Sequence, residues 1–155
     1  MGELLAGIEQ LALVKGLKAS FFAYPIVNAL HIMSIGVLLT CLLLMDLRIV
    51  GAFGSVPAAP LVGLLRRVAL VAFGGALFTG VLLFSVRARD YAAMPIFLAK
   101  MVLVLLAGAN FLAFAWASRG GIGEKPARPA VVTLALVSLA LWICVLFAGR
   151  FIGFL

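Results

Sequence analysis

Four long runs without a charged side chain place the strongest limit on the fold. They cover residues 19–45, 68–86, 101–118 and 129–149. A helix needs about 20 apolar residues to cross the hydrocarbon core of a bilayer, where it satisfies its own backbone polar groups. The shorter segments of alternating polarity that mark transmembrane strands do not occur in the sequence. We therefore predict four transmembrane helices, near residues 20–46, 67–87, 95–118 and 129–152.

The amino-acid composition supports this assignment. Of the 155 residues, 66% are apolar and 11% are charged, and the mean hydropathy is +1.32. A soluble domain is nearer half apolar and a quarter charged, and a disordered chain has low hydrophobicity. Both classes are excluded, and the fold expected for residues 20–155 is an all-α integral membrane four-helix bundle.

The first 19 residues differ from the rest of the chain. Glu3, Glu9, Lys15 and Lys18 are interspersed here with apolar residues at helical spacing. This pattern is typical of an amphipathic helix that lies in the membrane interface. Acidic residues in place of a basic leader argue against a cleaved signal peptide. We predict an amphipathic interfacial helix over residues 1–19.

The formal net charge of +7 comes from basic residues that stand singly or in pairs at the ends of the apolar runs. Lysines and arginines placed in this way anchor a helix to lipid headgroups. The expected partners are the lipid bilayer and other membrane subunits or a second copy of the chain, and not nucleic acid. Six basic residues fall on each side of the membrane, so the positive-inside rule favours periplasmic termini only if Lys100 is counted as intramembrane.

Polar side chains line one face of the first predicted span, at Tyr24, Asn28, His31 and Ser34. His31 is the single histidine, and it lies roughly 15 Å into the span at 1.5 Å per residue. A polar group at this depth usually faces the bundle interior, either as an interhelical hydrogen bond or as a site for a ligand or a proton. We expect a neutral His31 that is hydrogen-bonded to Asn28, Lys100 or a buried water.

The third span carries a second polar face with Lys100 and Asn110. Lys100 either extends to the interface or joins Asn28 and His31 in a polar intramembrane site. Asn110 is expected to form a hydrogen bond to a neighbouring helix. The candidate ligand site therefore comprises Tyr24, Asn28, His31, Lys100 and Asn110.

Charged residues also flank the connection between the first two spans. Asp46 ends the first uncharged run, and Arg66 and Arg67 precede the second run on the same side. We expect an interfacial ion pair between Asp46 and one of these arginines, worth about 0–1 kcal/mol if solvated. Within the second span, Gly75 and Thr79 form a small-residue pattern that permits close helix approach, within the molecule or between copies.

The sequence offers no catalytic constellation and no metal site with several ligands. Two cysteines, Cys41 and Cys144, stand inside apolar runs without a histidine cluster, and we expect both to be buried apolar residues. A carboxylate pair is also lacking, so no enzyme activity is expected. Haem b or copper at His31 would need a methionine, a ligand from a partner or an open position on the metal.

Several motifs resemble those of a known protein family. They are Pro25–His31, Met45–Gly51, Phe78–Ser85, Pro95–Lys100 and Gly108–Asn110. Together they resemble a family of small bacterial inner-membrane proteins of unassigned activity, distantly similar to the four-helix domains of CopD-type copper-resistance proteins. The resemblance covers residues 20–115 and implies four helices. The chain departs from it at Asn28, Met94 and Ala115, where the family has Glu, Asn and a second His, so any ligand that the second His provides is missing.

These observations predict a non-enzymatic multi-pass protein of the bacterial cytoplasmic (inner) membrane. It is expected to act as an accessory or assembly subunit with a polar intramembrane site around His31. Two alternatives stay open, a membrane protein that binds haem b or copper through His31 and a small permease or proton conductor.

Overall fold

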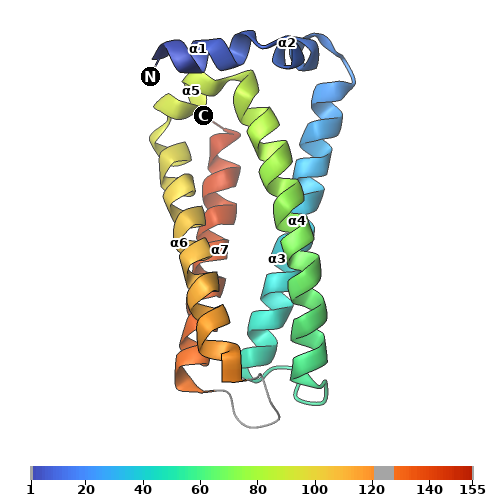
Figure 1. The fold of residues 1–155 in the computed structure, drawn as a ribbon, viewed down its shortest axis with the longest axis vertical. Coiled ribbons are helices and arrows are strands. Elements are labelled where there is room, and N and C mark those ends of the chain that lie inside the picture. The colour runs from blue at the N-terminus through green and yellow to red at the C-terminus, as the bar shows by residue number, and fades with distance from the viewer. Residues whose placement is uncertain (1, 121–127, 155) are drawn as a thin grey trace.

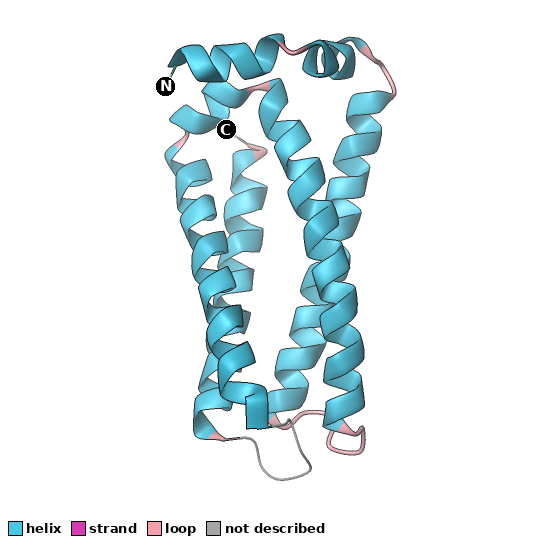
Figure 2. Cartoon of the chain, viewed as in Figure 1, coloured by secondary structure: helices cyan, strands magenta, loops and turns pink. Residues whose placement is uncertain are grey.

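The computed structural model describes residues 2–120 and 128–154, and this part of the chain is helical with no strand. Its long helices are α3 (Ala23–Val50), α4 (Ala58–Val86), α6 (Pro95–Ala117) and α7 (Pro129–Ile152). All four are long and apolar enough to cross a membrane. The prediction of an all-α four-helix bundle is confirmed, and loops are confined to its two ends (Figure 2).

The helices around the first connection extend further than the uncharged runs predict. Helix α3 continues to Val50 and α4 begins at Ala58, because two charged residues near the end of a helix do not interrupt it. Gly51 ends α3 with a φ of 115°, a left-handed conformation that glycine adopts without a steric penalty. The amide of Ala52 then donates to the carbonyl of Leu47 over 2.9 Å, which satisfies one of the terminal carbonyl groups of the helix.

The long helices form two hairpins, α3 with α4 and α6 with α7, which meet mainly where α3 packs against α7 (Figure 1). The main apolar core lies toward the end of the bundle that holds the α3–α4 connection. Its buried members are Leu38, Cys41, Leu42, Met45, Ile49, Val62, Ala69, Ala72, Phe114, Val131 and Ala135. Many large apolar side chains remain on the outside, including Val71 and Leu105, as expected for a surface that lipid covers.

The N-terminal segment is two short helices and not the single helix predicted over residues 1–19. Helices α1 (Gly2–Gln10) and α2 (Ala12–Ala19) are separated at Leu11, where the backbone leaves the helical conformation. Both lie across the end of the bundle opposite the α3–α4 connection (Figure 1). The break allows α2 to bury Val14 and Leu17 against Val86 of α4, so its apolar face is directed to the protein.

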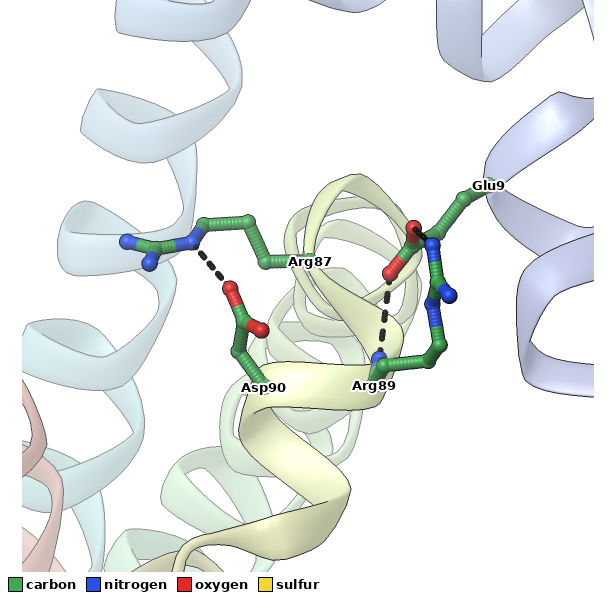
Figure 3. Close-up of polar contacts among 4 residues, drawn as sticks. All are labelled: Glu9, Arg87, Arg89 and Asp90. Atoms are coloured by element: carbon green, nitrogen blue, oxygen red, sulfur yellow. Dashed lines mark hydrogen bonds and ion pairs between the residues drawn. The ribbon is translucent and has the colours of Figure 1, made fainter. Parts of the chain in front are cut away.

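A carboxylate attaches α1 to the short helix α5 (Ala88–Ala93) that joins α4 to α6. The Arg89 backbone amide donates to Glu9 Oε1 over 3.0 Å, and its guanidinium donates to Glu9 Oε2 over 3.3 Å (Figure 3). The first amides of a helix have no partner within the helix, so Glu9 supplies an acceptor from another element. This backbone hydrogen bond holds the pKa of Glu9 below its ordinary value of 4.5.

Candidate functional site

His31 faces α4, and its hydrogen-bond partner there is not one of those expected from the sequence. Its Nδ1 lies 2.9 Å from Thr79 Oγ1, and the expected partners Asn28 and Lys100 form no hydrogen bond with it in the described residues. The sequence marked Thr79 only as a small packing residue. The pairing follows from the hairpin, because antiparallel helices that turn near residues 51–57 bring position 31 level with position 79.

The hydrogen bonds around Thr79 determine which ring nitrogen of His31 carries the proton. Thr79 Oγ1 lies 2.6 Å from the carbonyl oxygen of Gly75. A carbonyl only accepts and a hydroxyl has one hydrogen, so the threonine donates to Gly75. Nδ1–H of His31 must then donate to Thr79 Oγ1. In the neutral imidazole this leaves a free lone pair on Nε2, because the hydrogen bond that His31 forms within residues 2–120 and 128–154 is made by Nδ1. The backbone carbonyl of Ala76 also lies beside the imidazole, and a carbonyl only accepts.

Small residues of α4 make room for this contact. A Cβ atom added at Gly80 would stand 3.1 Å from Cε1 of His31, and one added at Gly75 would stand 2.8 Å from Oγ of Ser34. Both distances are shorter than ordinary van der Waals contact. The small-residue pattern of the second span is therefore used within the molecule, to bring α4 against the polar face of α3.

The other residues of the predicted polar site are arranged differently. Tyr24 and Asn28 are exposed in the described chain. Lys100 extends from α6 toward α7, where its Nζ would lie 3.4 Å from a Cβ atom added at Gly149. No hydrogen bond in the described part of the chain joins Asn28, His31 and Lys100. The amide of Asn110 donates to the carbonyl of Leu134 over 3.0 Å, which is the interhelical hydrogen bond expected from the sequence.

The predicted ion pair of Asp46 with Arg66 or Arg67 is absent from the described residues. Asp46 is only 2% exposed, and its neighbouring polar group is the Ser138 hydroxyl of α7. Its Oδ2 atom has no hydrogen-bond partner in the part of the chain that the structure describes. The guanidinium of Arg66 instead lies over the ring of Phe111, 5.1 Å from its centroid. The prediction was wrong because Asp46 lies one turn inside α3, on a face that α7 covers.

A cavity of about 190 Å³ lies beside Asp46, between all four long helices. Its polar wall residues are Asp46, Arg66, Asn110 and Ser138, and the rest of the wall is mostly apolar. The remaining lining residues are Leu38, Leu42, Met45, Ala69, Leu70, Phe73, Ala107, Gly108, Phe111, Phe114 and Trp142. The sequence did not indicate this cavity, because it depends on how four helices are rotated toward one another.

The described residues contain no group of three or more His, Cys, Asp and Glu side chains that could hold a metal ion. Cys41 is buried as expected, whereas Cys144 is exposed on the outer surface, in contrast to the prediction. His31, the single histidine of the sequence, is a potential ligand through its unprotonated Nε2. Comparisons of the chain with known protein families, with curated proteins and with solved structures found no match.

Proposed function

We propose that this protein is a non-enzymatic, multi-pass accessory or assembly subunit of the bacterial inner membrane that binds a partner through the face of α3 around His31. The observation that carries the proposal is the Nε2 atom of His31, to which no hydrogen bond is made within the described residues. Thr79 holds the imidazole by Nδ1, and the imidazole therefore offers an oriented acceptor within the membrane. Such a polar atom is costly in hydrocarbon unless a partner satisfies it.

The surroundings of His31 support a partner that approaches along α3. Tyr24 and Asn28 precede His31 on this helix and are exposed, so they can contact a second membrane protein or a second copy of the chain. The same proposal places both termini in the periplasm. It is supported by the resemblance of the sequence to small bacterial inner-membrane proteins. Helices α1 and α2 would then lie on the periplasmic face, and the α3–α4 connection would be cytoplasmic.

A photocrosslinking experiment in the native host tests this function. A benzophenone amino acid replaces Asn28 in one variant and Leu105, which is 73% exposed on α6, in a matched variant. We expect a discrete cross-linked product from position 28 only, and its loss when His31→Leu is added. Equal products from both positions, no product from position 28, or a product that persists without His31 would contradict the proposal.

A second candidate function, the binding of haem b or copper, is supported by the same hydrogen bond. A histidine that ligates a metal usually donates its other ring N–H to a neighbouring acceptor, which fixes the ring. His31 makes such a bond from Nδ1 to Thr79, and Nε2 would be the ligating atom. His31 is the single histidine of the sequence, so this chain would supply one histidine ligand.

The visible absorption spectrum and the metal content of the protein purified from its host distinguish the two functions. A Soret band or stoichiometric copper that disappears in His31→Leu would support cofactor binding. Thr79→Val serves as the matched variant, because it removes the acceptor and leaves the imidazole in place. If a bound cofactor depends on the fixed ring, Thr79→Val should weaken its retention without abolishing it. A colourless, copper-free protein would leave the subunit function as the proposal.

A further inference from the structure

The cavity beside Asp46 contains a polar atom for which the described residues provide no hydrogen bond. Asp46 is 2% exposed, and its Oδ2 atom has no hydrogen-bond partner among residues 2–120 and 128–154. A buried carboxylate oxygen without a donor is unfavourable, and native structures rarely contain one unless an unseen group completes it. Asp46 also lines the cavity, so a molecule that occupies this space could supply the missing donor.

The size of the cavity limits the molecule that it can hold. Its volume is about 190 Å³, and an apolar protein cavity of about 150 Å³ is sufficient to bind benzene. The space therefore accepts one six-membered ring with a short substituent.

The lining residues define the chemistry of the occupant. Phe73 and Trp142 contribute aromatic surface, and Leu38 and Leu42 contribute aliphatic surface, so the body of the ligand should be apolar. At Asp46 the ligand should carry a hydrogen-bond donor, and a charged donor forms the stronger bond to a carboxylate. Arg66 does not neutralise Asp46, because its guanidinium is placed over Phe111 and forms no ion pair in the described chain.

We propose that this cavity binds a small primary amine with a single ring, whose ammonium group pairs with Asp46 while the ring fills the apolar part of the cavity, which Phe73 and Trp142 help to line. The site is separate from His31. His31 contacts α4 nearer the N-terminal end of α3, toward the end of the bundle opposite the α3–α4 connection. An experiment can therefore support or contradict the amine-binding site without deciding the proposed subunit function.

Benzylamine is the probe, and benzyl alcohol is the uncharged probe of the same shape. The protein is studied as the full chain in phosphatidylcholine nanodiscs, since this lipid carries no primary amine that would compete. Trp142 reports on the cavity once Trp116→Phe has removed the other tryptophan, which is 69% exposed on α6. Fluorescence of Trp142 is then measured as each probe is titrated.

Three variants locate any binding that is observed. Asp46→Asn removes the charge and preserves the shape. Gly108→Leu adds a branched side chain at the cavity wall, and a Cβ atom added at Gly108 has no other atom within 4 Å, so the backbone need not move. Asp90→Asn changes a carboxylate outside the cavity, one that pairs with Arg87 over 2.8 Å on the surface (Figure 3).

We expect saturable binding of benzylamine that is at least tenfold tighter than binding of benzyl alcohol. The affinity should fall at least tenfold in Asp46→Asn, vanish in Gly108→Leu and stay unchanged in Asp90→Asn. Absence of saturable binding, equal affinity for amine and alcohol, or unchanged affinity in Asp46→Asn would each overturn the proposal. If Asp46→Asn does not fold, the comparison of the two probes in the unmodified cavity and the result for Gly108→Leu still decide it.

Discussion

Each of the two hairpins contains a hydrogen bond between its helices. One bond joins a side chain to the backbone, and the other joins two side chains. Between α6 and α7, the Asn110 amide donates to the backbone carbonyl of Leu134. Between α3 and α4, His31 donates to the side chain of Thr79. The first bond depends on the identity of one residue, because every residue has a carbonyl. The second depends on two residues and on the room that Gly80 provides.

This difference suggests a structural role for the bond of Asn110 and a binding role for His31. A hydrogen bond from Asn110 to a carbonyl holds two helices together and has an obvious role in folding. The bond from His31 consumes one ring nitrogen and leaves the other with a free lone pair. A hydrogen bond between α3 and α4 does not require a histidine. The histidine therefore makes the α3–α4 hairpin the better candidate for a binding site.

The largest effect is expected where the α3–α4 hairpin is closest. Gly80→Leu would force a branched side chain toward the His31 imidazole, which is already 3.1 Å from the position of a Cβ atom. Such overpacking typically costs about 1–3 kcal/mol in the free energy of unfolding. Denaturant unfolding in mixed micelles, followed by circular dichroism, measures it. Gly74→Leu is the matched control on the same helix, since its Cβ meets no atom within 4 Å, and an equal loss there would refute the specific contact.

A double-mutant cycle should show that the His31–Thr79 bond couples two side chains. We expect His31→Leu and Thr79→Val to share a coupling energy of about 0.6–1.7 kcal/mol, which runs from the average to the largest value for side-chain hydrogen bonds between membrane helices. The same unfolding assay provides the four values. Strictly additive losses would mean that the two residues contribute separately and that the hydrogen bond does not orient the imidazole.

The α6–α7 hairpin should give a smaller loss and no coupling. Asn110→Ala is expected to cost about 0.6 kcal/mol, the average for such bonds. Leu134→Val keeps the carbonyl that accepts the bond, so its effect should add to that of Asn110→Ala without an interaction term. A clear coupling in this cycle would remove the distinction between the two hairpins.

The smallest effect concerns the attachment of α1 to α5 and depends on pH. Because the pKa of Glu9 is lower in the folded protein than its ordinary value of 4.5, its carboxylate favours the folded state above that value. This contribution decreases as the pH falls below 4.5 and disappears once the folded-state group is protonated. In an NMR titration, the Arg89 amide resonance should shift with a midpoint below 4.5. Glu9→Gln should abolish the shift, and a midpoint above 4.5 would contradict the hydrogen bond.

Much of the fold could be predicted from the sequence because it depends on local composition. The positions of α6 and α7 follow from uncharged runs of sufficient length, and Pro95 and Pro129 mark their first turns. The polar face of α3 and the interhelical bond of Asn110 follow from helical periodicity and from the cost of leaving an amide unsatisfied in hydrocarbon. The amphipathic character of the N-terminal segment was also evident, although the break at Leu11 was not.

The sequence by itself determined that the chain forms four apolar helices and that polar atoms in them need partners. Which partners they find was decided only by the tertiary structure. Thr79, rather than Asn28 or Lys100, bonds to His31 because the hairpin places it at the same depth. Asp46 faces Ser138 and a cavity, rather than an arginine, because α3 extends past it and turns it toward α7. Hydropathy acts on each segment alone, whereas a hydrogen bond requires a register and a rotation that only packed helices define.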